Sequence, residues 1–178
     1  MFNNMAFIGG IHGVGKSTIC RTICNSLMIN YLSASEVIKW SEFNDDIKNK
    51  KVTDIPLTQN LLIDCLYKQI EKNKFYLLDG HYCLLNKENI ISKIPYETFE
   101  MINPNSLHII INDDISEIKS RIETRDNRRY DFNLLEDMQE MEIDYAKELS
   151  IKLGIQLSIG KENNYSDVEN LLKRTFNI

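Results

Sequence analysis

The chain has no excess of positive charge and no hydrophobic run long enough to cross a membrane. Its 178 residues hold 21 Lys and Arg against 26 Asp and Glu, a formal net charge of −5 at pH 7. This balance argues against a broad face for DNA or RNA. No basic region precedes the short apolar stretch at the N-terminus, so we expect a first strand there and no signal peptide. We therefore expect a cytoplasmic protein without a membrane partner.

Paired-cysteine motifs, internal repeats and linkers rich in Pro or Ser are also missing. The cysteines at 20, 24, 65 and 83 show no C-x-x-C spacing. Cys20 and Cys24 are four residues apart, which is typical of small buried thiols on a helix. A zinc site would need two further ligands, and no nearby Cys or His pair supplies them. The composition, 43% hydrophobic and 26% charged, is that of a single globular domain spanning 1–178.

Short apolar runs alternate with amphipathic segments along the chain. The runs expected to form strands are 5–8, 30–32, 75–78, 107–111 and 155–159. Helices are expected at 16–28, 33–40, 56–72, 96–102, 115–125, 133–153 and 165–176, with a polar loop at 86–95. Strands that are apolar on both faces are typical of buried parallel sheets. The pattern predicts an α/β fold of three layers, with about five parallel strands covered by helices on both faces.

A glycine-rich motif follows the first apolar run. Gly10-Ile11-His12-Gly13-Val14-Gly15-Lys16-Ser17-Thr18 matches G-x-x-x-x-G-K-[ST] at every fixed position. In such a loop the backbone N–H groups curl around a polyphosphate, and the next helix adds its positive N-terminus. Lys16 can reach the β- and γ-phosphates, and the Ser17 hydroxyl can hold Mg²⁺. The alternative is a chance glycine-rich turn, but a strand before the loop and a helix after it favour a P-loop NTPase fold that binds a nucleoside triphosphate.

Asp79 directly follows the apolar run at 75–78, at the carboxyl edge of the predicted sheet. A P-loop protein carries at this place the acid that orients Mg²⁺ or its waters, although an Asp-Gly turn is the simpler alternative. His81, two residues later, is either structural or a holder of a water or phosphate oxygen. His12 lies near the phosphates by its place in the loop, through its backbone more than through its ring.

Four arginines form the most basic stretch of the chain. Arg121 and Arg125 are four residues apart and share one helix face, and Arg128 and Arg129 follow in a polar turn. This could be a solvated helix face. Guanidinium groups also suit the neutralisation of charge in phosphoryl transfer, and this favours a lid at about 125–132 that closes over the nucleotide.

These motifs resemble, in order and in approximate spacing, those of the small adenylate kinases of archaeal and nuclear type. The match rests on the loop Gly13–Thr18, on Asp79-Gly80-His81, which resembles the family's Asp-x-His, and on Arg121-Ile122-Glu123-Thr124-Arg125, which resembles its R-L-E-T-R helix. The likeness runs from Phe7 to about Tyr145. It implies reversible transfer of the γ-phosphoryl group of MgATP to a nucleoside monophosphate, or hydrolysis where water is the acceptor.

The resemblance also implies a role for each matching residue. The residues that it assigns to catalysis are Lys16, Asp79, His81, Arg121 and Arg125. Those that it assigns to ATP are Gly13, Val14, Gly15, Lys16, Ser17, Thr18 and Arg125. Ser17 and Asp79 would hold magnesium, Arg125 would be the lid arginine over ATP, and Arg121 would lie near the transferring phosphate.

The acceptor half departs from the pattern of adenylate kinases. Ordinary adenylate kinases continue Leu-Leu-Asp-Gly with Phe-Pro-Arg, whose Arg grips the monophosphate, whereas Tyr82 and Cys83 follow here, without an arginine. The acceptor segment, about 31–60, contains no arginine. Its candidate phosphate-binding cations are Lys39, Lys48, Lys50 and Lys51. Lysines lack the bidentate fork of arginine. Gln59 can read a base edge, although a single glutamine on a helix is a weak signal.

Three functions are therefore open. The first is a kinase of a nucleoside monophosphate, with ATP and Mg²⁺ as cofactors. The second is an ATPase or nucleotide switch that controls a protein partner through segment 31–60. The third is a kinase of a nucleoside or another small metabolite, with Asp79 as the base for a hydroxyl group.

Overall fold

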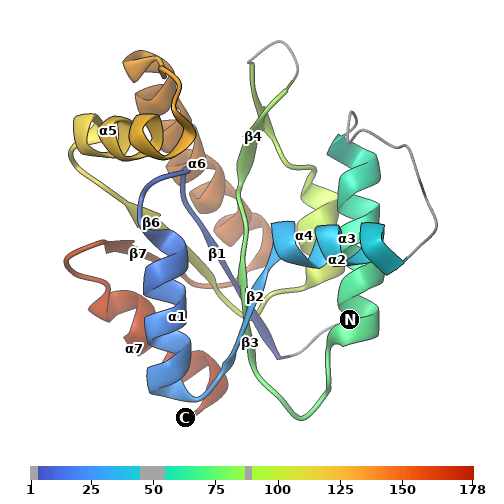
Figure 1. The fold of residues 1–178 in the computed structure, drawn as a ribbon. Helices are drawn as coiled ribbons and strands as arrows, with labels where there is room; N and C mark the ends of the chain where they lie inside the picture. The colour runs from blue at the N-terminus through green and yellow to red at the C-terminus, as the bar shows by residue number, and fades with distance from the viewer. Residues whose placement is uncertain (1–3, 45–54, 87–89) are drawn as a thin grey trace.

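A computed structural model describes residues 4–44, 55–86 and 90–178, without the side chains of 40–44 and 55–57. A five-stranded parallel sheet forms its centre (Figure 1), in the order β2-β3-β1-β6-β7. These strands are β1 (Met5–Gly9), β2 (Asn30–Ser33), β3 (Tyr76–Asp79), β6 (Leu107–Ile111) and β7 (Leu157–Lys161). The helices are α1 (Lys16–Leu27), α2 (Ala34–Asn44), α3 (Ile55–Gln69), α4 (Tyr96–Ile102), α5 (Ile115–Asp126), α6 (Phe132–Leu153) and α7 (Ser166–Phe176).

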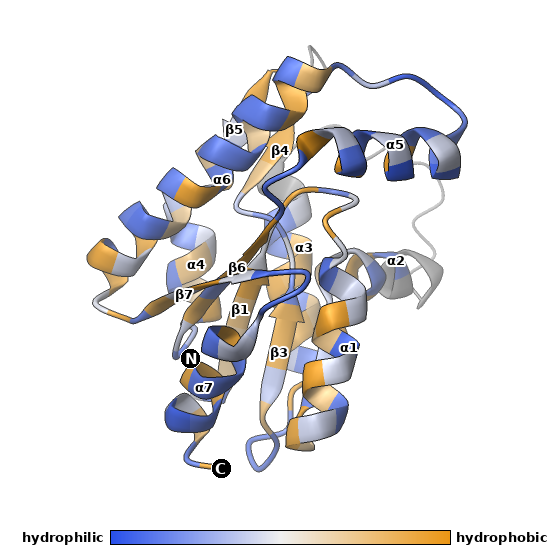
Figure 2. Cartoon of the chain, turned by 90° about the vertical axis from the view of Figure 1, so that its left-hand side faces the viewer, coloured by the Kyte–Doolittle hydropathy of each residue, from blue (hydrophilic) through white to orange (hydrophobic). Residues whose placement is uncertain are grey.

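Helices cover both faces of the sheet, as the sequence predicts. Successive residues of a strand point to opposite faces. Met5 and Phe7 of β1 therefore join the core beneath α3 and α4, whereas Ala6 and Ile8 join the core beneath α1 and α7. Figure 1 shows α1 and α7 on one side of the sheet and α3 and α4 on the other. The hydrophobic strands lie between helices whose outer faces are hydrophilic (Figure 2). The expectation of a three-layer P-loop NTPase fold is confirmed.

One segment differs from the prediction of a polar loop at 86–95. Strands β4 (Cys83–Leu85) and β5 (Ile91–Lys93) pair there as an antiparallel hairpin. The hairpin is held against α6, where the Tyr145 hydroxyl donates to the carbonyl of Ile94 at 2.6 Å. Each strand is three residues long and only partly buried, so the local sequence carries little alternation of apolar and polar residues.

Helix boundaries differ in two places. Helix α3 runs from Ile55 to Gln69, so it begins one residue before the expected start at 56 and ends before the expected end at 72. Helix α2 continues to Asn44, beyond the expected end at residue 40. Three candidate phosphate-binding lysines, Lys48, Lys50 and Lys51, lie outside the described residues. Every helix in the described part of the chain falls short of the length or the apolar character that a membrane crossing requires.

His108 is a fully buried histidine in β6 whose effect on stability can be tested. Its Nε2 lies 2.9 Å from the Ser106 hydroxyl and its Nδ1 lies 2.7 Å from the Ser158 hydroxyl. Burial lowers the pKa of His108 from 6.5 to about 3. Between these two values the unfolded chain binds a proton that the folded chain does not bind. Stability conferred by the neutral ring is therefore lost as the pH falls below 6.5.

We expect the free energy of unfolding to fall by about 1.4 kcal/mol per pH unit below pH 6.5 on account of His108. His108→Gln should flatten this slope by about one proton, measured by urea denaturation between pH 6.5 and 5. Burial also lowers the pKa of His12, to about 4, but His12 is present in both proteins and cancels from the difference. Equal slopes in the two proteins would contradict a neutral, buried His108.

Candidate active site

The glycine loop, residues 10–15, joins β1 to α1 at the carboxyl edge of the sheet. Gly10, Gly13 and Gly15 have φ values of 137°, 83° and 86°, which side-chain-bearing residues rarely adopt. Gly15 is the N-cap of α1, and no side chain caps the helix. The first N–H groups of α1 are thus available to an anion. The loop has the local geometry of a polyphosphate cradle.

Asp79 accepts hydrogen bonds from three side chains just above this loop. The Lys16 ammonium donates to its Oδ1 and, at 2.8 Å, to the carbonyl of Gly80. The Ser17 hydroxyl and the Tyr31 hydroxyl donate to its Oδ2 at 3.0 Å and 2.8 Å. Lys16 and Asp79 are both buried, so their pairing offsets the penalty of removing each charge from water.

The register of the sheet explains how these residues meet. Asp79 pairs with Ile8 of β1 on one side and with Ser33 of β2 on the other. The ends of three parallel strands therefore lie at one level, beside the start of α1. Lys16, Ser17 and Asp79, which the sequence predicts at one site, lie in hydrogen-bond contact in the structure. It did not indicate Tyr31, which was read only as part of a short strand.

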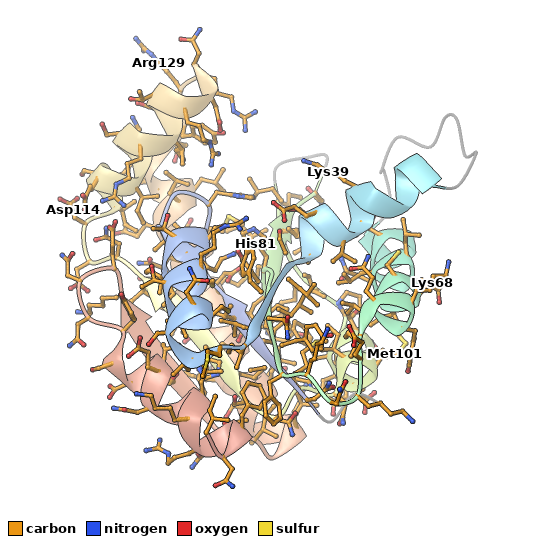
Figure 3. The ribbon with its side chains drawn as sticks, turned by 60° about the horizontal axis from the view of Figure 1, so that its bottom comes forward. Lys39, Lys68, His81, Met101, Asp114 and Arg129 are labelled. Carbon is orange, nitrogen blue, oxygen red and sulfur yellow. The ribbon has the colours of Figure 1, made fainter. Side chains whose placement is uncertain are left out.

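His12 and His81 lie side by side, with their ring centroids 4.3 Å apart. Figure 3 shows His81 between helices α1 and α2. Burial is the main cause that lowers the pKa of His12 to about 4, and the neighbouring His81 is the next, so the His12 ring is uncharged at neutral pH. His81 Nδ1 is buried without a hydrogen bond in the described part of the chain, 3.5 Å from Glu142 Oε1. Both rings thus belong to the site.

Glu142 of α6 is a functional candidate that the sequence reading missed. It is fully buried, and its Oε2 accepts the N–H of Gly10 at 2.8 Å. Its Oε1 accepts the N–H groups of Tyr82 and Cys83 at 2.9 Å and 3.0 Å. One carboxylate therefore fastens the glycine loop to the turn after Asp79. The available signal was its helical spacing, since Glu142 lies on the apolar stripe with the buried Met138, Tyr145 and Leu149.

The predicted arginines divide into two groups. Arg121 and Arg125 line the cavity at the glycine loop. Arg121 is held by Glu117 and, at 2.7 Å, by Glu162, while Arg125 pairs with Asp126 at 2.6 Å. The other group turns elsewhere: the Arg128 guanidinium stacks 4.5 Å from the centre of the Tyr130 ring, and Arg129 lies far from His81 at the outer end of α5 (Figure 3). Closure of 125–132 as a lid stays a prediction.

Two cavities meet at this site. The loop cavity, about 440 Å³, is lined by the glycine loop with Arg121, Arg125 and Glu162. The side cavity, about 370 Å³, lies between the ends of β1 and β3 and the helices α2, α3 and α4. Residues common to both are His12, Lys16, Ser17 and His81. Asp79 lies on the wall of the side cavity. The geometry thus offers two adjoining compartments that share one set of polar side chains.

The residues present fit a magnesium-bound triphosphate. The Ser17 hydroxyl and the Asp79 carboxylate, 3.0 Å apart, are the hard oxygen ligands that Mg²⁺ prefers. Within the described ranges, no group of three His, Cys, Asp or Glu residues could hold a metal by itself. This suits an ion that is bound jointly by one or two protein oxygens and by phosphates.

The sheet order, the glycine loop and the Lys16–Asp79 pair define a P-loop NTPase fold. A family model described as an AAA domain, AAA_17, matches residues 9–139. The chain therefore belongs to the AAA_17 family. The resemblance to adenylate kinases of the Asp-x-His type stays a prediction.

Two solved structures are similar to nearly the whole chain. A gluconokinase from Sinorhizobium meliloti 1021 has a TM-score of 0.55 at 10% identity, covering 99% of this chain and 93% of that one. An uncharacterized protein from Eubacterium ventriosum ATCC 27560 has a TM-score of 0.50 at 13% identity, covering 98% of each chain. At such identities the similarity shows a shared fold. Among curated protein sequences, none matches this chain.

The glycine loop can be tested at Gly13. A Cβ there would lie 2.4 Å from the Ile122 side chain, on a backbone that is already left-handed. We expect Gly13→Ala to weaken MgATP binding about tenfold or more, because the clash with Ile122 displaces loop N–H groups whose hydrogen bonds to a charged phosphate contribute about 1.5–3 kcal/mol each. Isothermal titration calorimetry measures the change.

Gly154 provides the matched control for this substitution. It also has a positive φ, 66°, but a Cβ there would meet no atom within 4 Å, and it ends α6 away from the glycine loop. Gly154→Ala should lower stability by about 1–2 kcal/mol and leave ATP affinity unchanged. Equal ATP affinities in both variants and the parent protein would contradict the cradle assigned to Gly13.

Proposed function

We propose that this protein is an ATP-dependent small-molecule kinase, which binds the ATP phosphates in the loop cavity and the phosphate acceptor in the side cavity. The observation that carries this proposal is the meeting of the two cavities at Lys16, Ser17, His12 and His81. A kinase needs such a junction, because the acceptor oxygen must lie in line with the transferring phosphoryl group.

In this proposal the loop residues neutralise and orient the triphosphate. The N–H groups at the start of α1 and the Lys16 ammonium face the phosphate oxygens. Ser17 and Asp79 hold Mg²⁺, which, when bound, neutralises charge that builds up on the phosphates. Arg121 and Arg125 supply further positive charge from the wall of the loop cavity.

In this proposal the side cavity binds the acceptor, so that the γ-phosphoryl group is transferred to that molecule and not to water. Apolar side chains of α2, α3 and α4 line one side of the cavity, among them Ile38, Leu62 and Phe99. An acceptor bound there displaces water from the junction and holds its own oxygen in place. The proposal makes these walls responsible for the choice of acceptor.

The acceptor that the sequence resemblance implies is a nucleoside monophosphate, with a nucleoside or another small metabolite as the alternative. One structural neighbour is a gluconokinase, which supports a small-molecule acceptor in general. The fold is compatible with each of these, so the residues of the side cavity must distinguish them.

The proposal is tested by measuring ADP formation from MgATP with and without candidate acceptors. We expect an acceptor to increase the rate well above that in buffer and to be recovered in phosphorylated form. A slow hydrolysis that nucleosides, nucleotides and sugars all leave unchanged would overturn the kinase proposal. It would favour the nucleotide switch that controls a protein partner.

A further inference from the structure

We infer that the side cavity binds an uncharged acceptor of the nucleoside class, with a planar base and sugar hydroxyl groups, rather than a nucleotide or a sugar acid. The inference rests on the proposed function and concerns its acceptor. It follows from the charge of the cavity, from its apolar wall and from one buried amide.

The lining of the side cavity carries few charged side chains. Among the described residues that line it, the side chains with a permanent charge are Lys16 and Asp79, and these two are paired with each other. The ring of His12 is uncharged at neutral pH because its pKa is lowered to about 4. A phosphate or carboxylate on the acceptor would therefore lie beside Asp79 without a cation of its own. An unpaired charge in such a place is strongly disfavoured.

Among the described residues, no lysine of segment 31–60 adds positive charge to the lining of the side cavity. Lys39 is exposed on α2 and is not among the residues that line the side cavity (Figure 3). The whole segment 31–60, including the residues that the structure does not describe, contains no arginine in its sequence. The bidentate guanidinium clamp that suits a monophosphate is thus missing from it.

The wall of the cavity suits a planar apolar body. Phe7 and Phe99 line it with their rings edge to face, 5.2 Å between centroids, and Ile38, Leu62 and Ile102 complete the apolar side. Aromatic and branched side chains of this kind pack well against a flat ring system. A polyhydroxy sugar acid would instead bury hydroxyl groups against carbon, with few polar partners.

One buried amide gives the cavity a recognition element. Gln59 is only 6% exposed and lines the cavity from α3, and no hydrogen bond joins its amide to another described residue. A glutamine amide presents a donor and an acceptor side by side, which matches the edge of a nucleobase. Among the described residues, His81 Nδ1 is the buried side-chain polar atom without a partner, so water still reaches the Gln59 amide, and a base edge that replaces this water can form both hydrogen bonds.

Hydroxyl-bearing residues lie near the junction with the loop cavity. Ser33 of β2 is in register with Asp79, and its hydroxyl lies 3.1 Å from that of Ser35. Both serines line the side cavity. They can bond the sugar hydroxyls of a nucleoside without adding charge. Apart from the Lys16–Asp79 pair and the imidazole of His81, the polar groups of the cavity are therefore neutral donors and acceptors.

The reaction that follows is balanced without another reactant. The acceptor's hydroxyl oxygen forms a bond to the γ-phosphorus of ATP, and the bond from that phosphorus to the β–γ bridging oxygen breaks. ADP leaves with the electron pair of that bond, and the hydroxyl proton passes to water. The product is a nucleoside monophosphate.

The experiment compares acceptors that differ in charge. The full-length protein is incubated with MgATP and one of three groups: the nucleosides adenosine, guanosine, cytidine and thymidine; their monophosphates; and gluconate. ADP formation and the mass of the product are measured. We expect at least one nucleoside to be phosphorylated with a kcat/KM at least tenfold above that of its own monophosphate and of gluconate.

Variants of Gln59 test the recognition element. Gln59→Leu should raise the KM for the nucleoside about tenfold or more and leave the KM for ATP unchanged. Gln59→Glu, of the same shape, should also raise it and change the preference among bases. Asn60→Leu, exposed on the same helix, is the matched control and should change neither constant.

The outcomes separate this inference from the proposed function. Preferential phosphorylation of a monophosphate or of gluconate would overturn the uncharged acceptor and leave the kinase in place. An unchanged nucleoside KM in both Gln59 variants would also overturn it. Failure of every acceptor would overturn the inference together with the kinase.

Discussion

Lys16→Met is expected to lower kcat/KM for phosphoryl transfer about 10²- to 10³-fold, the loss typical of removing one preorganised charge from a reacting centre. The substitution keeps the length of the side chain and removes the ammonium that lies between Asp79 and the carbonyl of Gly80. Initial rates of ADP formation with a saturating acceptor measure the effect. Lys68→Ala, exposed on α3, is the control and should leave kcat/KM unchanged (Figure 3).

Loss of Lys16 also leaves Asp79 buried without its cation. Removal of one member of a buried pair typically costs about 3–5 kcal/mol of folding stability. The double variant Lys16→Met with Asp79→Asn removes both charges and should recover much of that stability without recovering activity. If the double variant regains activity together with stability, Lys16 acts through folding alone and its role at the phosphates is contradicted.

Glu142→Ala is expected to lower the free energy of unfolding by about 3–5 kcal/mol, because it leaves three buried backbone N–H groups without an acceptor. These groups belong to Gly10, Tyr82 and Cys83. Glu142→Gln should cost less, since its remaining oxygen can still serve Tyr82 and Cys83 while its amide faces the Gly10 N–H. Urea denaturation measures both changes.

The same substitutions should weaken ATP binding, because Glu142 fastens the glycine loop at Gly10. Glu140→Ala, exposed on the same helix, provides the control and should stay within about 0.5 kcal/mol of the parent protein. A Glu142→Ala protein as stable as Glu140→Ala would show that the buried carboxylate does not hold the loop.

The parts of the site that are local in sequence could be predicted from it. The glycine loop is a contiguous motif, and its place between a strand and a helix indicated its conformation. The proximity of Asp79 to the glycine loop could be predicted because parallel strands end at one edge of a sheet. The register of β1 with β3 agrees with that reasoning, since Ile8 lies opposite Asp79.

The parts that depend on tertiary contacts could not be predicted in the same way. Tyr31 reaches Asp79 only because β2 pairs with β3, and Glu142 reaches the loop from a helix 132 residues further along the chain. The β4–β5 hairpin has only three residues in each strand and is fastened to α6 by a buried contact, in which the Tyr145 hydroxyl donates to the carbonyl of Ile94 at 2.6 Å. No local pattern encodes these contacts, although the place of Glu142 on the apolar stripe of α6 indicates that it is buried.

The side cavity combines a feature that the sequence shows directly with one that only the tertiary structure reveals. Gln59 was singled out in the sequence, but one glutamine on a helix gives no reason to choose it. Its burial and its place beside Phe99 and Leu62 supply that reason, because they show an amide directed at a small-molecule cavity. The absence of arginine from 31–60 is evident in the sequence, and the cavity explains its consequence: the described lining has one side chain with a permanent positive charge, Lys16, which is paired with Asp79.

The most direct measurement follows the γ-phosphoryl group itself. ATP labelled with ¹⁸O in its γ-phosphate is incubated with the protein, Mg²⁺ and a nucleoside, and ³¹P NMR together with mass spectrometry locates the label. We expect the labelled phosphoryl group on the nucleoside, with little inorganic phosphate, and transfer about 10²- to 10³-fold slower in Lys16→Met. Label found only in inorganic phosphate, whichever acceptor is present, would contradict a kinase with an acceptor site in the side cavity.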